Sequence, residues 1–285
     1  MYQSFRNTLI LLFALLSFTG RAQTLSEPNA CQLGITLSGG AARGYAHIGV
    51  LRAFEEAGIE IDYVSGASMG AIVGLLYAAG KTPDEMLTIA KSIRKRRVTS
   101  SGRFSLRKKG LDYMEQILKK HITATTFDEL EKPFFVCVTN FQSGQYEIIS
   151  EGEIMPAVRA SAAVPFVYRQ QIINGTAYID GGVVNNLPVE PLRDVCLKVV
   201  GISVNPIEYK SKKMSLKKQV FRVSELMINE NEARRIAMCD YHLEIPDLGS
   251  IDFEAYDQPE KIHDMGYRAA KEFLVQLNTF INQKD

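Results

Sequence analysis

Three features are scarce in this sequence of 285 residues: long apolar runs, cysteines at metal-binding spacings, and charge of one sign. The apolar run of residues 8–19 is shorter than the ~20 residues of a membrane-spanning helix. The four cysteines form no CxxC or Cys/His pattern, so we expect neither a metal site nor another cofactor. With 33 basic and 32 acidic residues, the overall charge selects no partner, and we expect no nucleic-acid partner.

The four cysteines raise the question of disulfides. They are Cys31, Cys137, Cys196 and Cys239, and each lies in or beside an apolar stretch. A chain of this length, with 46% hydrophobic residues, can fill a core without covalent cross-links. We therefore expect buried free thiols at these positions.

The N-terminus has the pattern of a secretory signal segment over residues 1–22. Arg6 supplies a basic start, residues 8–19 are almost wholly apolar, and Gly20 and Ala22 are small residues of the kind that precede a cleavage point. We expect cleavage before Gln23, export to the periplasm or the extracellular space, and a single domain over residues 23–285. An uncleaved membrane anchor is the alternative.

A candidate nucleophile lies in the stretch of residues 61–80. A β-like run is followed by Gly66-Ala67-Ser68-Met69-Gly70, and a helix pattern of small residues begins at once. This GxSxG pattern is typical of a strand, a sharp turn and a helix, with the serine hydroxyl at the tip of the turn and little side-chain bulk around it. The helix N-terminus adds free N–H groups beside Ser68. A tight turn packed through Gly66 and Gly70, without catalysis, is the alternative.

A glycine-rich loop over residues 38–44 also joins a predicted strand to a helix. Backbone N–H groups in such a loop bind anions. The GGAARG pattern lacks the GxGxxG spacing of a dinucleotide loop. It suits an oxyanion hole, with the N–H groups near Gly40 and Ala41 as donors and Arg43 adding positive charge. A simple helix cap remains the alternative. Because parallel strands end at the same edge of a sheet, we expect this loop beside Ser68.

Activation of Ser68 as a nucleophile requires a base that takes the proton of its hydroxyl. None of the four histidines lies in a loop with turn residues, where a triad histidine usually lies. Asp180 ends a short predicted strand and precedes Gly181 and Gly182, which allow close approach of the backbone. A carboxylate can take the serine proton directly if burial raises its pKa. Asp180 is therefore the candidate base, although Asp-Gly alone is more typical of a hairpin turn.

Nine basic residues and no acidic residue occupy residues 91–109. A solvated loop is one interpretation. The other is a basic flap that contacts anionic lipid head groups, since Lys and Arg near an anionic surface each contribute ~1 kcal/mol.

The order of predicted elements alternates strands with helices, which is typical of an α/β fold. We expect strands at 32–37, 61–65, 134–139, 146–149, 178–180, 198–204 and 241–245. We expect helices at 45–57, from 69, at 83–94, 111–121, 154–164 and 220–237, and from 259.

Four blocks of this sequence resemble the patatin-like phospholipase family: LSGGAARGYAHIGVL, GASMG, RASAAVPF and DGGVVNNLPV, in this order within residues 32–205. The resemblance implies a three-layer α/β/α sandwich with a mostly parallel sheet and hydrolysis of lipid acyl esters by a Ser-Asp dyad. It assigns Ser68 as nucleophile, Asp180 as base and Gly39–Gly44 as oxyanion loop. Gly66, Gly70, Gly181 and Gly182 support these turns. Ala41 departs from the family, where many members have a third glycine, and we expect a narrower loop with its donors intact.

The same residues allow two other functions. One is a serine esterase with a Ser-His-Asp triad, in which His242 or His263 is the base. The other is a non-catalytic lipid- or anion-binding protein with the same fold. The sequence does not specify the acyl chain, the head group or the oligomeric state.

Overall fold

The computed structural model describes residues 31–99, 110–208 and 216–282. The predicted signal segment and residues 100–109 of the basic segment lie outside the described residues. Cys31–Asp285 form one compact unit. Within the described residues, no helix combines the length and apolar character needed to cross a membrane.

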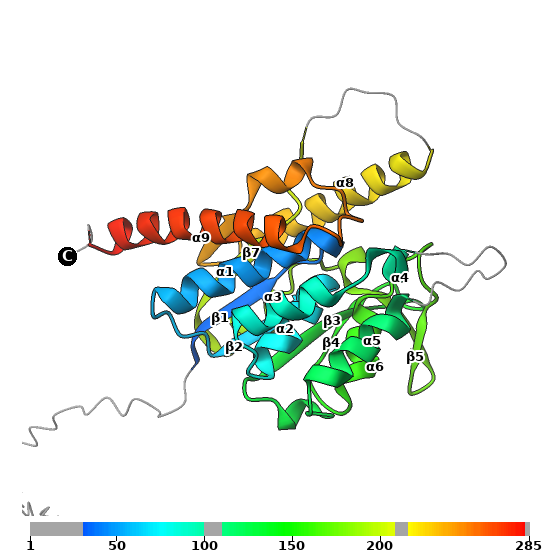
Figure 1. Ribbon diagram of the computed structural model, residues 1–285. Coiled ribbons are helices and arrows are strands. Elements are labelled where there is room, and N and C mark those ends of the chain that lie inside the picture. Colours follow the sequence, from blue (N-terminus) through cyan, green and yellow to red (C-terminus); the bar gives the residue numbers. More distant parts are fainter. Residues whose placement is uncertain (1–30, 100–109, 209–215, 283–285) are drawn as a thin grey trace, which may run out of the picture. The chain divides into compact units, whose positions relative to one another are not determined.

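The core of this unit is a mixed sheet (Figure 1). In the described residues its strands are β1 (Cys31–Leu37), β2 (Tyr63–Ala67), β3 (Phe134–Asn140), β4 (Tyr146–Ile149), β5 (Gln171–Ile173), β6 (Thr176–Asp180), β7 (Cys196–Ser203) and β8 (Tyr241–Glu244). Followed from one hydrogen-bonded neighbour to the next, the strands run β5-β6-β3-β2-β1-β7-β8, and β4 also pairs with β3. The five strands from β3 to β8 in this order are parallel, whereas β4, β5 and β6 are antiparallel to their neighbours.

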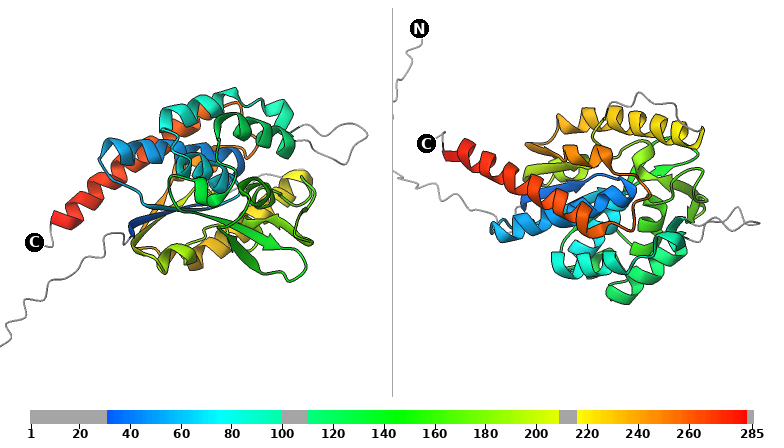
Figure 2. Two further views of the ribbon diagram at one scale, coloured as in Figure 1. Left: turned by 90° about the horizontal axis from the view of Figure 1, so that it is seen from below. Right: turned by 45° about the horizontal axis from the view of Figure 1, so that its top comes forward.

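Helices cover both faces of the sheet (Figure 2). In the described residues they are α1 (Tyr45–Glu56), α2 (Met69–Ala78), α3 (Pro83–Ser92), α4 (Lys95–Thr99), α5 (Gly110–His121), α6 (Ile154–Ser161), α7 (Glu190–Arg193), α8 (Leu216–Ile236) and α9 (Pro259–Asn282). Short 3-10 turns are η1 (Ala41–Gly44), η2 (Phe127–Glu129), η3 (Gly181–Val183) and η4 (Pro246–Ser250). The expected α/β/α sandwich is confirmed. β5, α4 and α7 have no counterpart among the expected strands and helices because they span only three, five and four residues.

The two faces of the sheet pack into cores of unequal size. The large core lies under α1, α2, α3 and α9 and includes Ile35, Leu51 and Leu75. On this face α1 packs along α9. The small core, where α7 packs on the sheet, contains Leu187, Leu192 and Val199. Burial of these side chains is the main force that holds the helices on the sheet.

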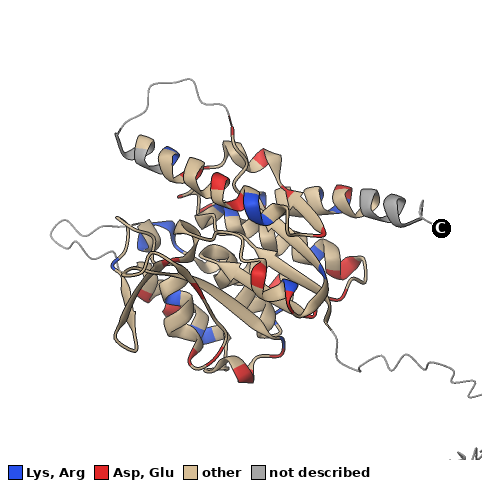
Figure 3. Cartoon of the chain, turned by 180° about the vertical axis from the view of Figure 1, so that it is seen from behind, with Lys and Arg blue, Asp and Glu red and all other residues tan. Residues whose placement is uncertain are grey.

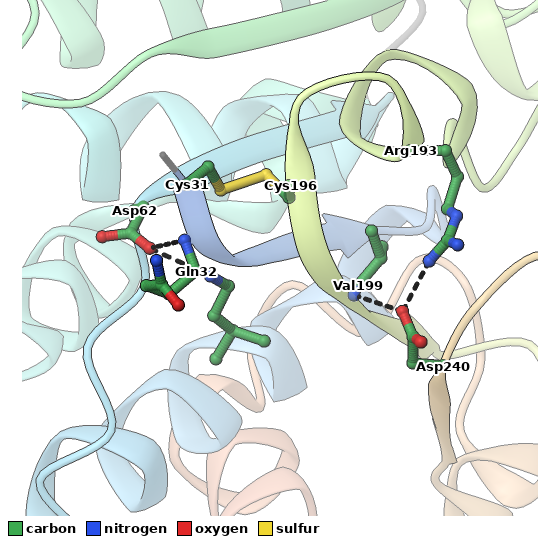
Figure 4. Close-up of a disulfide and its surroundings, with 8 residues drawn as sticks. Cys31, Gln32, Asp62, Arg193, Cys196, Val199 and Asp240 are labelled. Atoms are coloured by element: carbon green, nitrogen blue, oxygen red, sulfur yellow. Dashed lines mark hydrogen bonds and ion pairs between the residues drawn. A yellow bond between two sulfur atoms is a disulfide. The ribbon is translucent and has the colours of Figure 1, made fainter. Parts of the chain in front are cut away.

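The expectation of four free thiols is wrong for two of them. Cys31 begins β1 and Cys196 begins β7, and these neighbouring parallel strands place the two residues opposite each other, where they form a disulfide (Figure 4). Beside it, Asp62 accepts hydrogen bonds from the backbone N–H groups of Gln32 and Leu33. The two cysteines are 165 residues apart in sequence, so only the strand order brings them together. Cys137 and Cys239 are free.

Candidate active site

The site lies where the carboxyl ends of β2 and β6 face each other along one edge of β3. β2 runs parallel to β3 and ends with Ala67 opposite Cys137. β6 runs antiparallel to β3 and ends with Asp180 opposite Val138. Because β4 occupies the other edge of β3 over residues 136–139, β2 and β6 share an edge and point toward each other. This register brings the residue after Ala67 to Asp180.

Ser68 occupies a sharp turn between β2 and α2. Its backbone has φ 52° and ψ −120°, which is unfavourable for a residue with a side chain. The flanking glycines are required by close packing: a Cβ on Gly66 would lie 2.5 Å from the Gly70 carbonyl oxygen, and one on Gly70 would lie 2.1 Å from the Leu37 carbonyl oxygen. The Ser68 Oγ donates a hydrogen bond to Asp180 Oδ2 at 2.7 Å.

Asp180 is a buried carboxyl group at the end of β6, with 5% of its surface exposed. Its Oδ1 accepts a hydrogen bond from the Gly182 N–H at 2.8 Å. Burial raises the pKa of Asp180 from its ordinary 3.8 to about 7, while the bonds from Ser68 and Gly182 lower it in part. A carboxyl with this pKa can take and return a proton near neutral pH.

The four histidines all lie in the described residues, and each has surroundings other than Ser68 and Asp180. His47 Nε2 donates to the Ser38 carbonyl, and burial lowers its pKa to about 4. His242 contacts Ser203 Oγ, and His263 contacts Asp264. His121 is exposed at the end of α5. The geometry therefore offers Ser68 a carboxylate partner and gives no support to a triad histidine.

The glycine-rich loop after β1 lies directly against Ser68. A Cβ on Gly39 would lie 2.8 Å from the Ser68 Cβ. Gly40 and Ala41 border the same pocket as Ser68 and Asp180. Within the described part of the chain, the N–H groups of Gly40 and Ala41 have no acceptor. Ala41 adopts φ 47°, the left-handed region that a glycine would occupy more easily.

The side chain of Arg43, which we expected to add positive charge to an oxyanion hole, makes buried contacts with α8 and the segment after η4. Its guanidinium forms a buried ion pair with Glu225 of α8 at 3.1 Å and lies over the ring of Phe253. Its Nε donates to the Ile251 carbonyl at 2.9 Å. These contacts join the loop to α8 and to the segment after η4. Among the loop residues, the donors left for an oxyanion are backbone N–H groups.

Four further residues support the site and were not singled out from the sequence. Ser161 Oγ accepts the Ser68 N–H at 2.9 Å and donates to the Cys137 carbonyl at 2.6 Å.

Asn186, Asn205 and Glu232 form a buried polar group behind Gly39. Ser161 and Asn186 lie within RASAAVPF and DGGVVNNLPV, so these blocks held a signal. Nothing in the sequence connects Glu232 to them.

A pocket of about 720 Å³ opens beside Ser68 and Asp180. Most of its lining is apolar and comes from α8, from the segment after α6 and from the segment after η4; it includes Val164, Val167, Met227, Ile228 and Phe253. Phe166 borders it with 97% of its surface exposed. No group of three or more His, Cys, Asp or Glu residues able to hold a metal ion occurs in the parts of the chain that the structure covers.

Comparisons with known proteins find a mycobacterial and a fungal relative, among others. An uncharacterized NTE family protein of Mycobacterium tuberculosis is 33% identical over 181 residues, which are 62% of this chain and 50% of that protein. Lysophospholipase NTE1 of Mycosarcoma maydis is 28% identical over 281 residues, covering 85% of this chain and 15% of that protein. The chain thus spans half the length of the mycobacterial relative and a small part of the fungal one.

The fold has a counterpart among solved structures. VipD from Legionella pneumophila superposes with a TM-score of 0.51 at 15% identity, covering 83% of this chain and 67% of that one. The family model of the patatin-like phospholipases matches residues 35–193. This range contains Ser68, Asp180 and the glycine-rich loop, and it confirms the resemblance read from the four blocks. The chain belongs to the patatin-like phospholipase family.

Proposed function

We propose that this protein is a serine hydrolase of lipid acyl esters that uses Ser68 and Asp180 as a catalytic dyad. The observation that carries the proposal is the 2.7 Å hydrogen bond from Ser68 Oγ to the buried Asp180 carboxylate, at the border of an apolar pocket. The family membership supports the same chemistry.

In the proposed first step, Ser68 Oγ attacks the ester carbonyl while Asp180 takes its proton. The carbonyl oxygen becomes an oxyanion, which the N–H groups of Gly40 and Ala41 stabilise. Asp180 then gives the proton to the leaving alcohol, and the acyl group stays on Ser68. Water repeats the sequence and releases the fatty acid. These steps use side chains and backbone groups of this chain alone.

The proposed substrates are acyl esters of phospholipids or lysophospholipids. The apolar lining near Ser68 suits a fatty acyl chain, because burial of each CH₂ group contributes ~0.8 kcal/mol. One relative is named a lysophospholipase, which agrees with this substrate class. The pocket therefore supports recognition of the substrate through its fatty acyl chain.

Peripheral contact with a membrane is part of the proposal. Phe166 is exposed at the pocket, and Arg96 and Arg97 are exposed on α4 in the basic segment 91–109. Lys91 and Lys95 are paired with Glu260 and Asp257. Acidic and basic residues are interspersed in the view of Figure 3. We therefore limit the proposed membrane contact to the surroundings of Phe166, Arg96 and Arg97. Co-sedimentation with anionic vesicles should exceed that with zwitterionic vesicles, and equal binding would contradict a role for the basic segment.

We also propose export of the protein after cleavage before Gln23. The disulfide Cys31–Cys196 supports this, because disulfides persist in oxidising compartments. N-terminal sequencing of the mature protein tests the cleavage. Recovery from the cytoplasm with Met1 in place would contradict it.

The hydrolase proposal is tested with a panel of phospholipids, lysophospholipids and simple esters. Ser68→Ala and Asp180→Asn should each abolish most of the turnover, while circular dichroism shows the wild-type fold. A fluorophosphonate should label Ser68, with loss of fluoride, and Ser68→Ala should not be labelled. Failure of the wild-type protein to react would favour a binding protein with this fold.

A further inference from the structure

The orientation of one peptide group decides whether the glycine-rich loop can bind an oxyanion. The Gly39 carbonyl and the Gly40 N–H belong to the same planar trans peptide, so they point in opposite directions. The Gly39 carbonyl accepts hydrogen bonds from Asn205 Nδ2 at 2.6 Å and Asn186 Nδ2 at 3.2 Å. These two bonds hold the carbonyl toward the interior. The Gly40 N–H, which has no acceptor among the described residues, is thereby turned the other way, and Gly40 borders the pocket.

Each of these amide groups is in turn held by one carboxyl group. Glu232 of α8 is buried, with 2% of its surface exposed. Its Oε1 accepts a hydrogen bond from Asn205 Nδ2 at 3.1 Å and another from Asn186 Nδ2. Ser203 also hydrogen-bonds to the Glu232 side chain. Each NH₂ group thus gives one proton to Gly39 and one to Glu232.

The acceptor behind the two amides fixes which end of each amide faces Gly39. An asparagine amide can rotate and present either its oxygen or its NH₂ group. With a carboxyl oxygen on one side and the Gly39 carbonyl on the other, only the NH₂ groups satisfy both acceptors. Without Glu232, one of the two acceptors that disfavour the rotated amide is lost, so this rotamer costs less free energy. In the rotated amide no NH₂ group holds the Gly39 carbonyl.

We propose that Glu232 is a positioning residue for the oxyanion loop, acting through Asn205 and Asn186 on the Gly39–Gly40 peptide. This inference rests on the proposed hydrolase function and adds to it a residue that does not border the pocket. Glu232 lies 164 residues after Ser68, on a helix that contributes no reacting group.

The test compares Glu232→Met with Glu230→Met, which changes an exposed carboxylate on the same helix. Kinetics are measured with a soluble p-nitrophenyl ester. Glu232→Met should lower kcat roughly 10- to 100-fold, a smaller or equal effect to removal of an oxyanion donor, and leave KM unchanged. Glu230→Met should match the wild type.

An inhibitor that mimics the oxyanion separates positioning from general loss of structure. An alkyl trifluoromethyl ketone adds to a serine hydroxyl and places a negative oxygen in the oxyanion hole. Its affinity for Glu232→Met should fall by the same factor as kcat/KM. Inhibition by a long-chain primary alcohol, which fills the apolar pocket without an anionic oxygen, should not change. Equal loss of both affinities would overturn the proposal.

Conservative variants keep the test decisive if Glu232→Met does not fold. Glu232→Gln retains an acceptor oxygen at the same distance and should keep most of the activity. Glu232→Asp withdraws that oxygen by one methylene and should lower kcat at constant KM. Equal activity of these two variants would overturn the proposal.

A double-mutant cycle with Asn205→Ala tests the route of action. If Glu232 acts through Asn205, the double variant should lose little more than the larger single loss. Additive losses would overturn the route.

The hydrolase proposal and the role of Glu232 can fail separately. A wild-type protein that neither hydrolyses the ester nor reacts with a fluorophosphonate would refute the hydrolase proposal itself. An active wild type with an unimpaired Glu232→Met variant would refute only the role of Glu232.

Discussion

At the residue scale, the chemistry of the site depends on how deeply one carboxyl group is buried. Asp180 would have a pKa near 3.8 in water, and burial raises it to about 7. The GxSxG pattern places Ser68 on a turn, but no pattern reports the burial of its partner. Asp180 is buried because β6 pairs with β3 and packs against α6, with η3 following directly.

The proposed base sets the pH dependence of turnover. Asp180 must be ionised to accept the Ser68 proton, so kcat/KM should rise with pH through a midpoint near 7 and level off above it. A pH-rate profile with a soluble ester measures this. A midpoint near pH 4 would show that the carboxyl is not buried in solution.

The same pKa predicts a cost to stability. The folded state binds the Asp180 proton more tightly than the unfolded state, so this stabilisation is complete below about pH 3.8 and is lost as pH rises through about 7. Asp180→Asn should therefore raise the free energy of unfolding at pH 8, by up to about 4 kcal/mol, and change it little at pH 3. Urea unfolding at the two pH values measures both, and equal changes would contradict burial as the cause.

Ser161 should matter for turnover although it carries no reacting group. Ser161→Ala leaves the Ser68 N–H without its acceptor and frees a strained turn, so kcat should fall roughly 10-fold. Ser250→Ala, which removes an exposed hydroxyl that donates to the Asp247 carbonyl in its own turn, is the matched control. Steady-state kinetics of both variants provide the measurement, and unchanged kcat in Ser161→Ala would contradict this role.

At the scale of elements, α8 differs from the other long helices because it turns buried polar side chains to the site beside its apolar pocket residues Met227 and Ile228. Glu225 pairs with Arg43, Asn231 donates to the Gly182 carbonyl at 3.1 Å, and Glu232 holds two asparagines. An apolar stripe reveals the buried face of a helix such as α9. Since α8 has polar side chains where a core-facing stripe would be, the sequence predicts a helix there without predicting its partners.

The crossing of α1 and α9 depends on two glycines. A Cβ on Gly266 would lie 2.0 Å from the Ala46 carbonyl oxygen, and one on Gly49 would lie 2.0 Å from the His263 carbonyl oxygen. Gly→Ala usually stabilises an exposed helix by about 1 kcal/mol. Gly266→Ala should have the opposite sign, because the helices must separate, and should lower the free energy of unfolding by about 2 kcal/mol.

Thermal unfolding of Gly266→Ala measures this effect. Glu272→Ala, an exposed change on the same helix, is the control. A higher Tm in Gly266→Ala than in the wild type would show that the helices do not approach so closely.

At the scale of the whole molecule, β1 and β7 are joined both by hydrogen bonds and by the disulfide Cys31–Cys196. Between them in sequence lie Ser68, Asp180 and most of the sheet. The covalent link therefore closes a loop that contains the whole proposed dyad, and it restricts the unfolded chain.

Removing the disulfide should lower the free energy of unfolding by about 2–4 kcal/mol. Cys31→Ala with Cys196→Ala, or reduction of the wild-type protein, should give similar losses. Cys239→Ala removes a free thiol and is the control. Urea unfolding with and without reductant is the measurement, and a wild-type curve that reductant leaves unchanged would contradict the link.

Much of the fold was predictable because it is local. Alternation and helical spacing gave the seven longer strands and most helices, and the motifs around Ser68 and Asp180 gave both members of the proposed dyad. The propensities and turn preferences behind these patterns act between residues a few positions apart. They operate before any tertiary contact forms.

The tertiary structure decided what depends on distant partners. Ser68 and Asp180 are 112 residues apart, and they meet because β2 and β6 end at one edge of β3. The ion pair of Arg43 with Glu225, the disulfide and the two amides on Glu232 have the same origin. Register and burial are set by the packing of the complete chain, so a linear sequence pattern indicates the proposed reacting groups but not the groups that hold them.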